Sequence, residues 1–281
     1  MTRLTNIFLR LREQSQIWFS RFIILVLLGL IFFVAGGGVS HNKKWQIIQI
    51  NVEGANAVST DEVRAIALDK IIGNYFLVYA RNNSHLFPVG EINQTLLHTF
   101  PRIASVSAVR DDEHTITINI SERKPYALWC VEEPSSKDCW FIDEGGFVFD
   151  KAPEFSKGVY IEVYGKLVEK KAGEPLRASL PYDRFAIANG FTKLLRENIG
   201  KPFRIYIKSE DEIEVTIHTS AKHPFLADVV MRFKDTSDPA NLVNNLEKAI
   251  LTQFPNNIAP KKKLQYIDMR FGNKVIFGFE Q

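Results

Sequence analysis

The longest apolar segment of the chain covers residues 22–40, FIILVLLGLIFFVAGGGVS, and contains no charged residue. A helix rises about 1.5 Å per residue, so these 19 residues match the roughly 30 Å hydrocarbon core of a bilayer. A helix that packs on a soluble core usually keeps a polar face, and this segment has none. The pattern therefore predicts one membrane-spanning helix near the N-terminus.

The charges on either side of this segment predict its orientation. Four arginines and one glutamate precede it, whereas two lysines and then several acids follow it. Cytoplasmic flanks carry an excess of Arg and Lys, so we expect residues 1–21 in the cytoplasm and residues 41–281 outside it. Trp18 and Trp45 bracket the segment, as aromatic residues do at both membrane surfaces.

Two alternatives concern this N-terminal part. Residues 35–38 offer small side chains after an apolar run, which is also the pattern of a cleaved secretory signal. Residues 1–21 form either an amphipathic helix on the inner leaflet or a disordered tail whose arginines only set the orientation. We favour the retained helix and, slightly, the disordered tail.

Periodicity in residues 45–123 predicts an α+β module. Ser59 and Glu62 form a capping box at the start of the first helix, and Pro101 ends the second. The expected order is strand 45–52, helix 60–70, a short extended piece 75–79, helix 88–100, and strands 103–110 and 114–121. The buried helix faces are expected to contain Val63, Ile66, Ala67 and Ile71, then Ile92, Leu96 and Leu97. Two helices would then cover one face of a three-stranded sheet.

Residues 124–281 are predicted to form a β-rich domain with two helical inserts. The strand candidates are 126–131, 139–142, 146–149, 158–164, 203–208, 212–218, 227–233, 264–270 and 274–279. One helix, 183–199, buries Phe185, Ala188, Phe191, Leu194 and Leu195. The other begins at Asp238 and Pro239 and buries Leu242, Leu246, Ile250 and Phe254.

The composition favours no catalytic or nucleic-acid-binding class. The net charge is only +3, the basic residues are interleaved with acids, and the two cysteines and six histidines form no metal motif. Asp143 and Glu144 precede two glycines, which indicates a hairpin turn rather than a catalytic acid pair. Lysines 261–263 are a solvated run or, alternatively, a contact to anionic lipid or polymer. We expect no enzyme activity, no cofactor and no small-molecule substrate.

Three short motifs give the chain a resemblance to a known family. They read ISERKPYALW at 120–129, FIDEGGFVF at 141–149 and YIDMRF at 266–271. In this order, after a single apolar helix and a strand–helix–helix–strand–strand module, they resemble the bacterial cell-division proteins FtsQ and DivIB. That family has a polypeptide-transport-associated (POTRA) module followed by a β-domain. The paired cysteines are not a general feature of the family.

The resemblance implies a division of the chain and a role. Residues 1–21 would be a cytoplasmic tail, 22–40 the membrane helix, 45–123 the POTRA-like domain and 124–281 the β-domain. The protein would be a non-catalytic, single-pass scaffold of the plasma (inner) membrane at the division site. It would recruit the small coiled-coil proteins FtsB and FtsL and link early division proteins to septal peptidoglycan synthesis.

The sequence pattern has two alternative functional interpretations. A POTRA component of an export or assembly machine would need a membrane barrel or repeated POTRA units, and the sequence shows neither. A membrane-anchored cell-wall hydrolase would need a nucleophile or metal constellation, and no such motif is present. The scaffold is therefore the preferred interpretation.

Cys130 and Cys139 are predicted to form a disulfide. They end and begin neighbouring strand candidates, so a hairpin would place them opposite each other. Closing a loop of about ten residues contributes on the order of 2.5 kcal/mol through loop entropy. The alternative is a pair of buried free thiols.

The last two strand candidates are predicted to form the partner-binding surface. A terminal strand leaves one row of backbone groups unpaired, and an extended partner segment can add itself there. The last strand, KVIFGF, is apolar and carries no acid. The expected apolar anchors are Tyr266, Phe271, Ile276 and Phe279, and the expected charged rim is Asp268, Arg270 and Lys274. Alternatively, Val275 and Phe277 fill the domain core and the residues between them are incidental.

Overall fold

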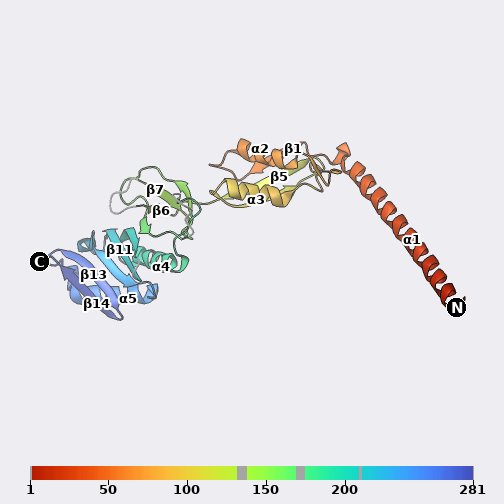
Figure 1. The fold of residues 1–281 in the computed structure, drawn as a ribbon. Helices are drawn as coiled ribbons and strands as arrows, with labels where there is room; N and C mark the ends of the chain where they lie inside the picture. The colour runs from red at the N-terminus through yellow and green to blue at the C-terminus, as the bar shows by residue number, and fades with distance from the viewer. Residues whose placement is uncertain (1, 132–137, 169–174, 209–210, 281) are drawn as a thin grey trace. The chain divides into compact units, whose positions relative to one another are not determined.

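The computed structural model describes residues 2–131, 138–168, 175–208 and 211–280, and the side chains of the first helix from Trp18 onward. The chain forms two compact units, Met1–Glu122 and Arg123–Gln281 (Figure 1). The predicted fold class is confirmed: an apolar N-terminal helix, an α+β unit and a β-rich unit follow one another.

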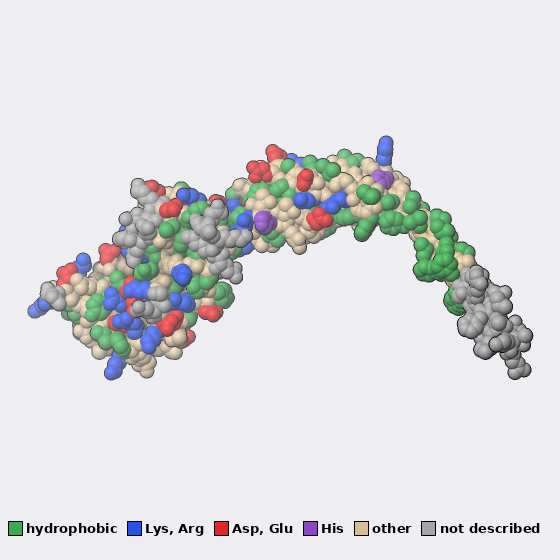
Figure 2. All heavy atoms as spheres, in the orientation of Figure 1, with side chains coloured by type: hydrophobic (Ala, Val, Ile, Leu, Met, Phe, Trp, Pro, Cys, Tyr) green, Lys and Arg blue, Asp and Glu red, His purple; other side chains and the backbone are tan. Residues whose placement is uncertain are grey.

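The first unit begins with one continuous helix, α1 (Thr2–Ser40). Its part Trp18–Ser40 is long and apolar enough to cross a membrane. The apolar side chains of this part are exposed, and Figure 2 shows them in green along the helix. The disordered tail favoured for the leader is wrong in this structure, because the helix starts at Thr2.

A three-stranded sheet covered by two helices follows α1. Its strands are ordered β1-β5-β4, with β1 parallel and β4 antiparallel to the central β5. The helices contact each other, and they pack on β1 and β4 respectively. The elements are η1 (Lys43–Trp45), β1 (Gln49–Glu53), α2 (Thr60–Ile71), β2 (Asn74–Tyr75), β3 (Tyr79–Ala80), α3 (Val89–Thr99), β4 (Ile103–Arg110) and β5 (Thr115–Glu122).

Local chemistry explains where this unit agrees with the sequence patterns and where it departs. The Ser59 cap is confirmed, since its hydroxyl accepts from the Glu62 N–H. The strand expected from residue 45 begins only at residue 49, because Asn42 caps a 3-10 turn over Lys43–Trp45. Leu97 was expected in the core and is 39 % exposed. The piece 75–79 forms a small hairpin, β2–β3.

The second unit is built on a nine-stranded sheet with strand order β14-β13-β12-β11-β10-β9-β6-β7-β8. Helices α4 and α5 contact each other and pack against this sheet, which buries one large apolar core between them. The strands are β6 (Ala127–Cys130), β7 (Cys139–Ile142), β8 (Val148–Lys151), β9 (Glu162–Gly165), β10 (Lys201–Ile207), β11 (Glu212–Thr219), β12 (Val230–Lys234), β13 (Leu264–Phe271) and β14 (Lys274–Phe279). The helices are α4 (Tyr182–Asn198), η2 (Pro224–Leu226), α5 (Pro239–Gln253) and η3 (Pro255–Asn257).

Both predicted helices of this unit are confirmed, whereas some of the predicted strand starts are wrong. Asp238 caps α5 by accepting from the Asn241 N–H, and all four core residues expected on this helix and at its end are buried. Leu194 of α4 is only partly buried. The strands expected from residues 158 and 227 begin at Glu162 and Val230, and the second follows the 3-10 turn η2.

Candidate partner-binding edge

Strand β14 forms one end of the nine-stranded sheet, and it pairs antiparallel with β13. In the register, Asp268 lies opposite Ile276 and Ile267 opposite Phe277. Among the described residues no strand pairs with the outer side of β14. The last strand therefore presents a free row of backbone N–H and C=O groups.

The free N–H groups of this edge can be assigned by alternation. The Glu280 N–H donates to the Lys263 carbonyl oxygen on the β13 side, at 3.0 Å. Because successive N–H groups of a strand point in opposite directions, those of Ile276 and Gly278 also face β13. The outward N–H groups then belong to Val275, Phe277 and Phe279.

The side chains of these three residues point into the domain core. Val275, Phe277 and Phe279 are partly buried and pack against the main apolar cluster. The Phe254 ring at the end of α5 lies 5.3 Å from the Phe277 ring and 6.5 Å from the Phe279 ring, measured between centroids. Phe279 was expected as a partner anchor. Side chains two positions apart on a strand share a face, so Phe279 lies on the core side with Phe277 and packs there.

The opposite side of the hairpin carries the accessible apolar residues. Ile276 is 45 % exposed and Phe271 56 % exposed. Tyr266 is half-buried: its ring lies over Gly278, where an added Cβ would come within 2.2 Å of the ring. The Arg232 guanidinium sits 4.9 Å from the centroid of the same ring. Tyr266 and Ile276 therefore form a rigid apolar platform beside the free edge.

Only part of the predicted charged rim is exposed at the edge. Lys274 is exposed, but Asp268 is buried and is held by the Arg270 guanidinium, with Nη2 2.6 Å from Oδ2. Hydrogen bonds from Arg270 lower the pKa of Asp268 and outweigh the opposite effect of burial. Arg270 also contacts Glu212 on β11, so the pair ties β13 to the middle of the sheet. Asp268 is therefore buried and ion-paired within the fold and is not exposed as a rim residue.

Charged residues continue from Arg270 across the helix-free face of the sheet. Lys208 contacts Glu212 at 3.0 Å and Glu214 at 2.7 Å, and the Arg232 Nε lies 2.9 Å from Glu214. Burial alone would raise the pKa of Glu212, but Lys208 and Arg270 lower it overall. The charges on this part of the face are therefore satisfied by one another.

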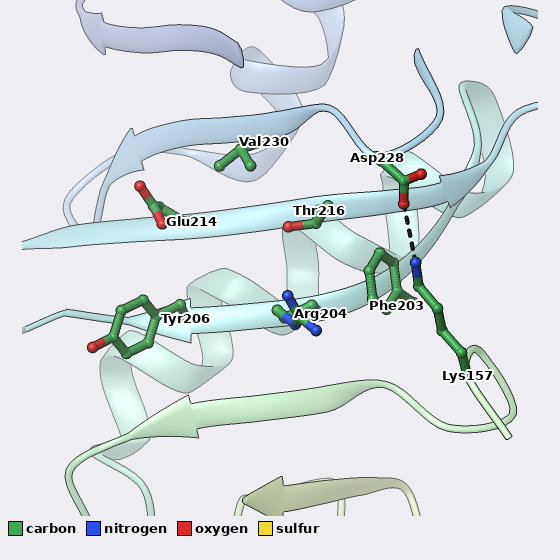
Figure 3. A pocket seen from close by; sticks show the side chains of 8 residues that line it. All are labelled: Lys157, Phe203, Arg204, Tyr206, Glu214, Thr216, Asp228 and Val230. Carbon is green, nitrogen blue, oxygen red and sulfur yellow. Dashed lines mark hydrogen bonds and ion pairs between the residues drawn. The ribbon is translucent and has the colours of Figure 1, made fainter. Parts of the chain in front are cut away.

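A shallow hollow of about 230 Å³ lies on the same face (Figure 3). Its lining residues are Lys157, Phe203, Arg204, Tyr206, Glu214, Thr216, Asp228 and Val230. Lys157 lies at one end of it and pairs with Asp228 at 3.1 Å, and Arg204 is paired with Glu162 at 3.5 Å. Within the described residues no group of three or more His, Cys, Asp or Glu side chains could hold a metal ion. The hollow presents paired charges and supports no catalytic assignment.

Charged residues of the first two sequence motifs form contacts within their own units. The Glu122 Oε1 accepts from the backbone N–H groups of Asn56, Ala57 and Val58, at 2.7–2.9 Å. Although burial opposes the effect, these bonds and the nearby Arg102 lower the pKa of Glu122.

The second motif is held by a similar contact in the other unit. Arg123 Nη1 lies 2.5 Å from the Asp143 carboxylate, whose other oxygen accepts from the N–H groups of Gly145 and Phe147. Arg123 also lies 4.1 Å from the Phe147 ring centroid. Asp143 is therefore a turn residue, as expected from the two glycines that follow Glu144.

Cys130 and Cys139 are joined in a disulfide in the structure. They lie opposite each other at the ends of β6 and β7, and the loop between them includes residues 132–137, which lie outside the described part. The bond closes the hairpin near the end of the sheet that is far from β14 in the strand order.

The structure brings together Tyr266, Phe271, Lys274 and Ile276 at the accessible edge, and it turns Asp268 and Phe279 inward. Sequence reasoning missed Gly278 and the outward backbone of Val275. The available signal was a glycine within an apolar strand, because such a glycine often marks the close approach of another group.

One family model matches the chain. Residues 46–123 match the model described as POTRA domain, FtsQ-type. No curated protein gives a significant match to the chain. The matched region begins shortly after the apolar helix and ends at the motif that contains Glu122 and Arg123.

Proposed function

We propose that this chain, which belongs to the FtsQ/DivIB family of cell-division proteins, is a scaffold that recruits small coiled-coil partners of the FtsB and FtsL type. The observation that carries the proposal is an FtsQ-type POTRA domain placed shortly after the apolar helix segment Trp18–Ser40. The family is non-catalytic, so the proposed role is assembly: bringing membrane-bound division proteins together where septal peptidoglycan is made.

The proposed topology follows from the arginine-rich leader. Residues 1–21 lie in the cytoplasm, 22–40 cross the plasma membrane, and the POTRA domain (45–123) and β-domain (124–281) lie outside. The Cys130–Cys139 bond supports this placement, because disulfides persist in oxidising compartments. Alkaline phosphatase fused to the C-terminus should be active. An inactive phosphatase fusion together with an active cytoplasmic reporter at the same site would reverse the orientation.

The proposed partner contact is strand addition at β14. A partner strand would pair with the outward N–H groups of Val275, Phe277 and Phe279 and lay its alternate side chains on Tyr266 and Ile276. The edge is apolar and carries no acid between residues 274 and 279, which suits a bound edge better than a free one. The internally paired charges on the neighbouring strands leave backbone pairing and apolar contact as the main contributions.

The experiment that tests the role is depletion of the protein from cells of its own organism. We expect filaments without completed septa, and recovery when the intact chain is supplied again. Normal septation after complete depletion would contradict a role in division.

A further inference from the structure

The end of the membrane helix contains three consecutive glycines, and two of them lie in close contact with the hairpin β2–β3. A Cβ on Gly37 would lie 1.9 Å from the Val78 Cγ1 and 2.9 Å from the Val78 carbonyl oxygen. A Cβ on Gly36 would lie 2.8 Å from the Tyr79 hydroxyl, whereas Gly38 has nothing within 4 Å. Gly36 and Gly37 therefore form a notch that receives the hairpin β2–β3.

The hairpin is fixed to one face of α1 by several contacts. Phe33, Gly36, Gly37 and Ser40 follow i, i+3, i+4, i+7 spacing and so share a face of the helix. The Tyr79 ring meets the Phe33 ring edge-on at 5.1 Å. The Ala80 N–H donates to the Ser40 Oγ at 3.0 Å, and Asn83 donates to the Ser40 carbonyl oxygen at 2.9 Å.

These contacts also show the direction in which the hairpin runs. Ala80 lies level with Ser40, and Val78 lies level with Gly37, three residues earlier along the helix. The strand therefore leads back toward the middle of α1, and the turn that precedes Val78 lies deeper still. At about 1.5 Å per helical residue, the turn lies roughly 5 Å or more below Ser40.

The turn itself consists of Phe76 and Leu77, which are 81 % and 93 % exposed. Both have positive φ, 47° and 65°. A β-turn whose two central residues both have positive φ normally uses Asn and Gly there, because bulky side chains are strained in that conformation. Two large apolar residues on a strained, exposed turn need an apolar environment that the described protein does not provide.

We propose that the hairpin β2–β3 is a second membrane contact, which inserts Phe76 and Leu77 into the lipid leaflet on the side of the folded units. Lipid is the expected occupant because the hairpin is packed on the apolar segment of α1, at a depth that the membrane itself fills. The inference concerns anchoring and holds whether or not the proposed division role is correct.

The polar groups of the hairpin limit how deep it can go. Asn74 pairs with Ala80 and Tyr75 with Tyr79, and the Val78 N–H donates to the Tyr75 carbonyl oxygen at 3.0 Å. At the base, the Arg81 guanidinium lies 4.9 Å from the Tyr75 ring centroid. Aromatic and arginine side chains of this kind are typical of the headgroup layer, so the tip reaches the boundary between headgroups and acyl chains.

The test uses the full chain in phospholipid vesicles at a high ratio of lipid to protein. A nitroxide is attached to Leu77→Cys and, in a second sample, to Ala57→Cys. Ala57 is exposed and lies in the turn that follows the C-terminal end of β1. Cys130 and Cys139 are bonded to each other and do not react with the label. Spin relaxation by oxygen, which concentrates in lipid, is compared with relaxation by a water-soluble nickel chelate.

We expect the label at position 77 to respond several-fold more to oxygen than to nickel, and the label at position 57 to respond mainly to nickel. Gly37→Ala should lower the oxygen preference at position 77 by displacing Val78, whereas the matched Gly38→Ala should leave it unchanged. Strong nickel access at position 77 would overturn the proposal. Protection of position 77 from both reagents would also overturn it, since that result means contact with protein rather than with lipid.

Discussion

The two edges of the nine-stranded sheet are built in opposite ways. At one end, β8 is four residues long, carries Asp150 and Lys151, and is covered: the Val148 N–H donates to the Ala178 carbonyl oxygen and the Arg177 N–H to that of Val148, both at 2.9 Å. At the other end, β14 is apolar, and within the described residues nothing pairs with its outer side.

This difference supports β14 as the proposed partner edge. Proteins usually protect an edge strand by shortening it, charging it or covering it, and β8 shows all three devices. Within the described residues β14 has no cover, and its only charge is Lys274 at the first position, so the apolar run that follows is costly to expose unless another chain supplies a strand. The comparison thus separates residues that stabilise the sheet from residues that present its free edge.

The largest expected effects come from the aromatic supports beneath each end. Phe254 is 6 % exposed and supports Phe277 and Phe279, whereas Phe149 is 2 % exposed and stacks on Phe141 near β8. Removal of either ring to Ala should cost about 3–5 kcal/mol of unfolding free energy. Denaturant titration measures this cost.

The two alanine variants should differ in partner capture. Under conditions where both remain folded, Phe254→Ala should weaken capture because β14 loses its support, and Phe149→Ala should not. Equal weakening by both variants would mean that the two ends do not have separate roles.

Loss of the disulfide near the covered edge should have the next largest effect on the unfolding free energy. Replacement of Cys130 and Cys139 by Ala should lower the unfolding free energy by about 2.5 kcal/mol, since the unfolded chain regains a closed loop. Partner capture should persist, because the bond joins β6 and β7 and not the strands of the free edge. Two reactive thiols in the wild-type protein under non-reducing conditions would contradict this prediction.

The ion pair beneath the free edge should make stability depend on pH. The pKa of Asp268 is lowered in the folded protein, so its ionised form stabilises the fold above the unfolded pKa of about 3.9. This contribution is lost as the pH falls through the lower folded pKa. Asp268→Asn should cost about 1–3 kcal/mol near pH 7, and the gap to wild type should close below about pH 4. A gap that stays constant down to strongly acidic pH would show that the charge is not the cause.

The smallest effect on stability should accompany the largest effect on binding. Ile276 is 45 % exposed, so Ile276→Lys should change the unfolding free energy by no more than about 0.5 kcal/mol. A lysine at position 276, in the middle of the apolar run and not at its start like Lys274, should nevertheless abolish partner capture, because it replaces the apolar contact with a charge. Leu251→Lys is the matched control, since Leu251 lies on α5 and is 67 % exposed. Capture by Ile276→Lys at wild-type affinity would place the contact elsewhere.

Much of the fold could be predicted from local patterns. The uncharged run predicted the membrane helix, and the caps at Ser59 and Asp238 placed the starts of α2 and α5. These signals depend on neighbouring residues only. The order of strands in the large sheet, and hence which strand ends it, depends on long-range pairing that no local pattern contains.

The candidate site shows the same limit more sharply. Alternation along KVIFGF predicted two faces, but which face met the core depended on Phe254, which lies in another element. Asp268 and Arg270 were expected to form a charged rim. Arg270 instead contacts both Glu212 on β11 and the buried Asp268. The membrane hairpin could not be predicted, because the match between Gly37 and Val78 joins residues that are 41 positions apart in the sequence.

Amide exchange at β14 addresses the free edge itself. The full chain in detergent is compared with and without the extracytoplasmic segment of the proposed FtsB-type partner, at single-residue resolution. We predict that the amides of Val275, Phe277 and Phe279 become protected on binding, while those of Ile276 and Gly278 are protected in both states. Binding that leaves the amides of Val275, Phe277 and Phe279 exchanging as fast as in the free protein would contradict strand addition at this edge.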